Sequence, residues 1–143
     1  LIALLHIIIY YAVGYVVVWQ SAEARAFYDG GDLQPFFTHM GNVFASSSWI
    51  VGVQFIRGLL WALVAVLVFR FSDGGRLRQS LTLFAVYWAW HAAPLILPNE
   101  MMPETVRMLH LVELSITAGL MALLAAAFLR PVGGAVRRAE TIG

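Results

Sequence analysis

Four long apolar blocks restrict the folds open to this chain more than any other feature of its sequence. They cover residues 1–19, 49–69, 80–97 and 106–129. At ~1.5 Å of rise per residue, a helix over each block is long enough to cross a hydrocarbon core ~30 Å thick. The sequence is 61% hydrophobic and 12% charged, whereas a soluble domain is about half apolar and a quarter charged. We therefore predict a single all-α domain over residues 1–143, an integral membrane bundle of four transmembrane helices.

The first block has an alternative interpretation as a signal peptide, with Ala22 and Ala24 as the small residues of its cleavage site. The block is longer than the 7–15 apolar residues of such a peptide and contains several tyrosines, which favours a helix that stays in the protein. Because the chain begins with Leu1 rather than methionine, we expect further residues upstream.

The distribution of arginine predicts the orientation in the membrane. The loop 70–79 contains three arginines and one acid, and the tail 130–143 contains three arginines and one acid. The connections 20–48 and 98–105 contain more acids than arginines. Because basic residues concentrate on the cytoplasmic side, both termini are expected inside and the two acidic connections outside. This pattern predicts a multi-pass protein of the bacterial inner membrane.

The connection 20–48 is too aromatic to be a solvated linker. Ser21 can cap a short helix, which must break at Gly30–Gly31. Pro35 suits the first turn of a second helix. That helix is expected either to lie on the outer face of the membrane or to begin the 49–69 helix early, with a kink near Ser46–Ser48.

Five polar side chains interrupt the apolar blocks, and the predicted orientation places them at one level. Gln54 and Arg57 are expected roughly 8–12 Å below the outer surface, and His110 and Glu113 roughly 6–11 Å below it. His91 is expected at roughly 9 Å. The sequence therefore predicts one polar cluster in the outer leaflet.

Charged groups inside a membrane face the protein interior and pair with one another. We expect Arg57 to pair with Glu113, while the cluster's other side chains satisfy the remaining hydrogen-bonding groups. Pro94 has no N–H to donate, so it is expected to leave a free backbone carbonyl beside His91. Two interpretations stay open: a purely structural ion pair, and a ligand or proton site.

The same residues include possible metal or haem ligands. His91, His110 and Glu113 are candidates, and His39 joins them if the 20–48 connection folds over the bundle rather than facing water. His6 is expected roughly 20 Å below the outer end of its helix, which makes it a poor partner for His91.

These observations predict a small membrane protein that is not an enzyme and has no cofactor. It is expected to be an accessory subunit of a membrane complex or a transport-type protein, with the lipid bilayer and other membrane subunits as its partners. The alternative is a haem- or divalent-metal-dependent redox enzyme using His91, His110 and Glu113. The absence of cysteine excludes disulfides and thiolate sites, and a net charge of +1 gives no basic surface for nucleic acid.

Overall fold

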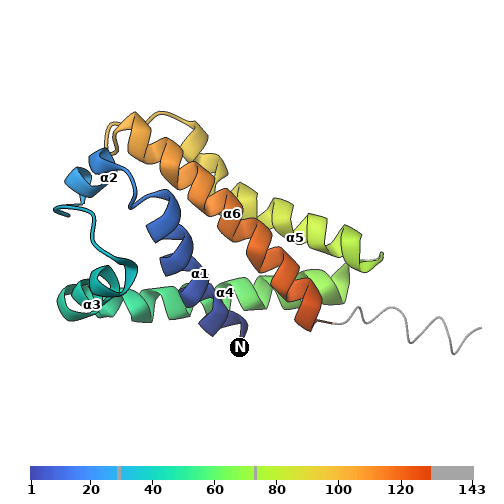
Figure 1. The fold of residues 1–143 in the computed structure, drawn as a ribbon. Coiled ribbons are helices and arrows are strands. Elements are labelled where there is room, and N and C mark those ends of the chain that lie inside the picture. The colour runs from blue at the N-terminus through green and yellow to red at the C-terminus, as the bar shows by residue number, and fades with distance from the viewer. Residues whose placement is uncertain (29, 73, 130–143) are drawn as a thin grey trace, which may run out of the picture.

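The computed structural model describes residues 1–28, 30–72 and 74–129. Over these ranges the protein is all-helical and contains no strand, as the sequence predicts. The elements follow one another as six α-helices and one 3-10 turn (Figure 1). Their bounds are α1 Ile2–Val17, α2 Ala22–Phe27, α3 Phe36–Ser47, α4 Trp49–Phe71, α5 Arg76–His91, η1 Ala93–Ile96 and α6 Glu104–Phe128.

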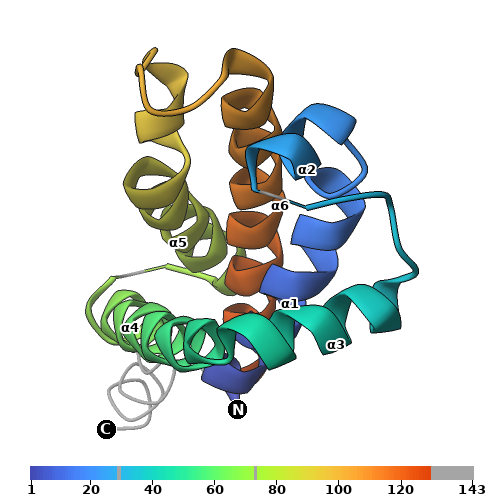
Figure 2. The same ribbon diagram turned by 90° about the vertical axis from the view of Figure 1, so that its left-hand side faces the viewer.

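The connection between α1 and α4 contains two helices whose starts the sequence predicts. The Ser21 hydroxyl accepts a hydrogen bond from the backbone N–H of Ala24 at 3.3 Å and caps α2. Pro35 is the N-cap of α3, and only Ser48 separates the end of α3 from the start of α4. The second of the two expectations is therefore confirmed, because α3 leads directly into α4 and the chain changes direction at the join (Figure 2).

Helix α1 lies between α4 and α6, and α5 packs along α6 (Figures 1 and 2). Helix α4 crosses α1 and α6 obliquely rather than running beside them (Figure 1). Helices α1 and α4 approach closely at Gly58, where a Cβ atom would lie 2.7 Å from the Cα of Ala3. Glycine is required here because any larger side chain would meet the backbone of α1.

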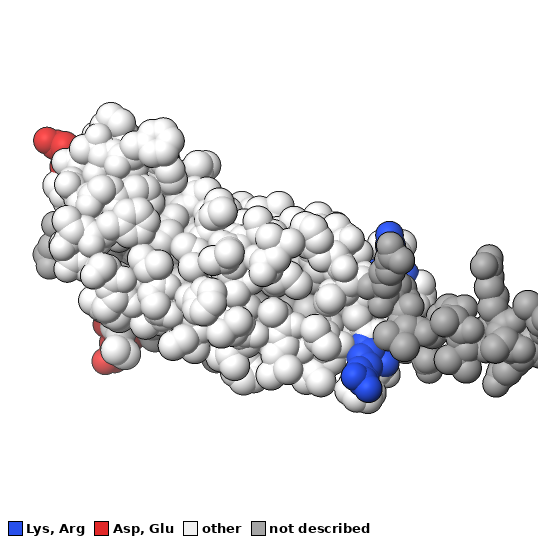
Figure 3. Space-filling view, turned by 90° about the horizontal axis from the view of Figure 1, so that it is seen from below, with Lys and Arg blue, Asp and Glu red and all other residues white. Residues whose placement is uncertain are grey.

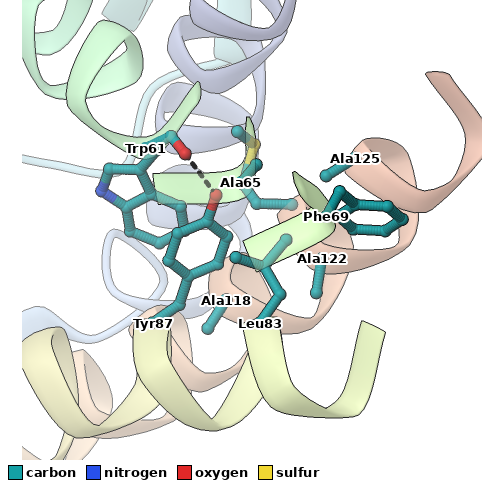
Figure 4. Packing of buried hydrophobic residues seen from close by; sticks show 9 residues of the cluster. Trp61, Ala65, Phe69, Leu83, Tyr87, Ala118, Ala122 and Ala125 are labelled. Atoms are coloured by element: carbon teal, nitrogen blue, oxygen red, sulfur yellow. Dashed lines mark hydrogen bonds between the residues drawn. The ribbon is translucent and has the colours of Figure 1, made fainter. Parts of the chain in front are cut away.

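The main core joins α4, α5 and α6 (Figure 4). Large side chains of α4 and α5 pack against small residues of α6, and the cluster consists of Trp61, Ala65, Phe69, Leu83, Tyr87, Ala118, Met121, Ala122 and Ala125. The Tyr87 hydroxyl also donates a hydrogen bond to the backbone carbonyl of Trp61 at 2.5 Å. The alanines of α6 let the neighbouring helices approach closely, as small residues do in membrane bundles.

Within the described residues two helices, α4 and α6, are long and apolar enough to cross a membrane, so the predicted bundle of four transmembrane helices is not confirmed. Helix α1 is apolar but has only 16 residues. The helix expected over 80–97 begins earlier, at Arg76, and ends at His91. Pro94 lies in the 3-10 turn that follows, so it stands outside the helix it was expected to disturb. The predicted tail arginines lie beyond the described residues.

Charged side chains gather at opposite ends of the molecule. In Figure 3 arginine is seen at one end and acidic residues at the other, with a long uncharged surface between them. The exposed arginines at the first end are Arg70, Arg76 and Arg78. The exposed acids of the described chain belong to α2, to the loops and to the start of α6, and are Glu23, Asp32, Glu100 and Glu104.

Candidate functional site

A chain of three hydrogen-bonded side chains connects the surface to a buried carboxylate. The Nδ1 atom of His110 lies 2.6 Å from Oε2 of Glu113, and its Nε2 atom lies 2.6 Å from the Tyr28 hydroxyl. Glu113 is only 2% exposed, whereas Tyr28 is 43% exposed. His110 and Glu113 are three residues apart on α6 and share one face of it. Tyr28 directly follows α2 and is separated from His110 by 82 residues in the sequence.

The direction of the hydrogen bonds along this chain follows from Tyr28. Burial and the nearby Glu113 carboxylate raise the pKa of Tyr28, so its hydroxyl keeps its proton. That hydroxyl can donate to Nε2 of His110, while the Nδ1–H of the same ring donates to Glu113. The three groups stand in the order in which a carboxylate orients a histidine ring toward a hydroxyl.

The carboxylate lies at a pocket of about 540 Å³ between α1, α3, α6 and the loop after α2. Aromatic side chains make up much of the wall, and they are Tyr10, Tyr11, Tyr15, Trp19 and Tyr28. The remaining lining groups with chemical function include His39, Asn42, Asp32, His110 and Glu113. The structure therefore brings three of the predicted residues, His39, His110 and Glu113, to one pocket.

His39 is held on the wall of this pocket by aromatic neighbours. Its ring centroid lies 4.1 Å from that of Trp19 and 5.9 Å from that of Tyr15. Removal from water lowers the pKa of His39, because burial penalises the charged imidazolium. The segment 20–48 thus folds over the bundle, the arrangement in which His39 was expected to approach the cluster.

The other three predicted residues belong to a second group around Trp61. The indole N–H of Trp61 donates to Nε2 of His91 at 3.1 Å. His6 also lies beside Trp61, with 5.2 Å between ring centroids. Nδ1 of His6 donates to the backbone carbonyl of Gln54 at 3.2 Å. Arg57 is close enough for its charge to act on both histidines.

The predicted ion pair between Arg57 and Glu113 is not formed. No carboxylate of the described residues lies within 4.0 Å of the Arg57 guanidinium, and Glu113 pairs with His110 instead. The charges of both residues act on Tyr10. The residues expected in one cluster therefore form two groups, one around Glu113 and one around Trp61.

The two groups are separate because the helices are not parallel. Counting residues from each helix end brings side chains together only when the axes run side by side, and α4 crosses the others obliquely (Figure 1). His6, which was expected to be a poor partner for His91, lies beside Trp61 as His91 does, with 5.2 and 4.5 Å between the ring centroids.

Arg107 is a buried polar residue whose role the sequence did not reveal. It lies near the start of the apolar block predicted over 106–129 and is only 5% exposed. Its guanidinium donates to the backbone carbonyls of Leu95 and Ile96 at 2.6 and 3.0 Å. These carbonyls lie at the end of η1, where the helix does not continue and offers them no N–H partner. Arg107 supplies the missing donors.

The proposed metal ligands are not assembled into a metal site. Within residues 1–28, 30–72 and 74–129, no group of three or more His, Asp or Glu side chains could hold an ion. His91 belongs to the Trp61 group, apart from His110 and Glu113. For haem, Nε2 of His91 is occupied by Trp61, and both ring nitrogens of His110 are occupied by Tyr28 and Glu113.

Searches against known protein families, curated proteins and solved structures found no match to this chain.

Proposed function

We propose that this is a small multi-pass protein of the bacterial inner membrane that carries a solute through the Glu113 pocket. It acts either alone or as a subunit of a larger membrane complex. The pocket would open first to the outer side, where the acidic connections lie, and then to the cytoplasm.

The surface of the helices supports a lipid environment. Helix α4 presents many large apolar side chains outward, among them Ile56 at 60%, Leu60 at 57% and Leu63 at 54% exposed. In water such a surface would be unfavourable by ~25 cal/mol per Å² of apolar area. Separation of arginines and acids to opposite ends, with no charge on the surface between them in Figure 3, suits a protein whose middle lies in hydrocarbon.

The single observation that carries the function is a buried carboxylate at an open pocket in an apolar body. Glu113 is 2% exposed but lines the pocket, and His110 and Tyr28 connect it to the surface. An ionisable group inside a membrane protein is costly and usually serves a substrate or proton pathway. The Tyr28–His110–Glu113 chain gives protons a route to and from the carboxylate without exposing it.

Single cysteines can test this proposal without knowledge of the solute, because the chain has none of its own. Ser47 lines the pocket, while Gly41 and Gly75 lie where an added side chain meets nothing within 4 Å. Each position is changed to cysteine and exposed to a membrane-impermeant thiol reagent in intact cells and in everted vesicles. Gly41→Cys is the outer control and Gly75→Cys the inner control.

Transport predicts that Ser47→Cys is labelled from both sides, since the pocket must open to each in turn. Gly41→Cys should react only in intact cells, and Gly75→Cys only in everted vesicles. Labelling of Ser47→Cys from one side alone, or from neither, would contradict transport. The opposite pattern in the two controls would refute the proposed orientation.

A further inference from the structure

We propose that the solute of the Glu113 pocket is an organic cation, with Glu113 as its counter-ion and the tyrosine rings as its walls. This inference rests on the proposed function, because it identifies the chemical class of the molecule that the same pocket takes.

The charged side chains that line the pocket have one sign. Glu113 and Asp32 line it, and no lysine or arginine of the described chain does. The nearby Arg25 guanidinium donates to the backbone carbonyls of Trp19 and Gly31 and is not among the lining side chains. The hydrogen bond from His110 to Glu113 needs only a ring N–H and no positive charge on the imidazole. An anionic solute would have to approach this carboxylate without a positive group to compensate it, which disfavours anions.

The carboxylate is held so that one oxygen stays available. Oε2 of Glu113 accepts the hydrogen bond from His110, while Oε1 faces Gly14, another residue of the pocket wall. A Cβ atom at Gly14 would lie 3.2 Å from Oε1. Because glycine has no side chain, it leaves space beside this oxygen that any other residue would fill.

The walls suit a cation that carries apolar groups. Tyr10, Tyr11, Tyr15 and Trp19 present aromatic rings, and a ring face attracts a cation by ~0.5–2 kcal/mol. The Tyr11 hydroxyl is buried and has no hydrogen-bond partner among the described residues, so it can serve a ligand. A volume of about 540 Å³ lies within the range of drug-sized ligands. A bare divalent ion would need several oxygen ligands, and these are not grouped here.

Two ions of nearly the same shape and opposite charge provide the test. The full chain is purified in a non-ionic detergent, and binding of tetraphenylphosphonium and of tetraphenylborate is measured by equilibrium dialysis against protein-free micelles. We expect the phosphonium to bind at least about tenfold more tightly than the borate, a difference equivalent to about 1.4 kcal/mol. In Glu113→Gln the phosphonium affinity should fall by about tenfold or more. Glu100→Gln removes an exposed acid outside the pocket and should leave the affinity unchanged.

Tyr11 gives a second measurement that does not depend on the folding of the Glu113 variant. Tyr11→Leu removes the ring and should weaken phosphonium binding by roughly two- to fivefold. Tyr11→Phe keeps the ring and should retain more of the affinity than Tyr11→Leu.

The inference is overturned if the phosphonium does not bind, if the borate binds equally well, or if Glu113→Gln and Tyr11→Leu both bind the phosphonium like the original chain. None of these results alters the labelling of Ser47→Cys. Failure of the cation inference is therefore distinguishable from failure of the transport proposal.

Discussion

Replacing Gly58 with alanine tests whether α1 and α4 cross as closely as the structure has them. An added Cβ would lie 2.7 Å from the Cα of Ala3, 2.8 Å from its carbonyl oxygen and 3.1 Å from the Cβ of His6. Carbon atoms in contact prefer ~3.5–4.0 Å, so α1 must withdraw by about 1 Å. Because two of these atoms belong to the backbone, no side chain can rotate away to relieve the clash.

The change in unfolding free energy caused by Gly58→Ala is best compared with that of Gly52→Ala, because both glycines lie in α4. A Cβ at Gly52 meets nothing within 4 Å, so Gly52→Ala should gain up to about 1 kcal/mol from helix propensity alone. Gly58→Ala has the same propensity gain but adds an overpacking cost of ~1–3 kcal/mol. The two variants should therefore differ by ~1–3 kcal/mol in the free energy of unfolding.

The assay is reversible unfolding of each purified variant by SDS in mixed micelles, followed by circular dichroism. Gly58→Ala should unfold at a lower mole fraction of SDS than Gly52→Ala. It should also weaken the His6 to Gln54 hydrogen bond at the crossing, which is visible as faster exchange of the His6 ring N–H in NMR. Equal stability of the two alanine variants would refute the close crossing.

Three other changes test single contacts. Tyr87→Phe removes the hydrogen bond to the Trp61 carbonyl and should lower the free energy of unfolding by ~0.5–1.5 kcal/mol; no change would mean that the bond is not formed. Arg107→Leu leaves two carbonyls of η1 without their donor and should cost ~1–3 kcal/mol, with faster amide exchange in residues 93–103; protection equal to that of the original chain would contradict the contact. The pKa of His39, measured by NMR, should lie below 6.5 and rise toward that value in Trp19→Ala. Since the unfolded chain binds the His39 proton more readily, stability should increase with pH up to about 6.5 and then level off; a measured pKa of 6.5 or higher would contradict the burial.

Local signals in the sequence predicted helix starts, and these are confirmed. The Ser21 cap, the start after Pro35 and the kink near Ser48 each depend on a few neighbouring residues. Such features need no knowledge of how the helices pack. The proximity of His110 and Glu113 was predictable for the same reason, since both lie on one helix face.

The arrangement of the helices in space was not predictable from the same signals. The oblique crossing depends on the absence of a side chain at Gly58. The position of this glycine in the apolar block 49–69 did not indicate that another helix contacts it there. Once α4 crosses obliquely, Arg57 lies near His6 and His91 instead of pairing with Glu113. Tyr28 was missed because it reaches His110 only after the chain returns through α2.

If the protein lies in a membrane as proposed, the separation of charge between its two ends couples its orientation to the membrane voltage. In the proposed orientation three exposed arginines face an electrically negative cytoplasm, and four exposed acids face outward. Arg25 and Arg107 offset two of those acids, which leaves five net charges at the two ends of the described chain. Turning the molecule over would move each of them across the potential at ~2.3 kcal/mol per 100 mV, or roughly 12 kcal/mol together. On this proposal an energised membrane would favour one orientation of the protein, and depolarisation would remove that preference without breaking any contact within the fold.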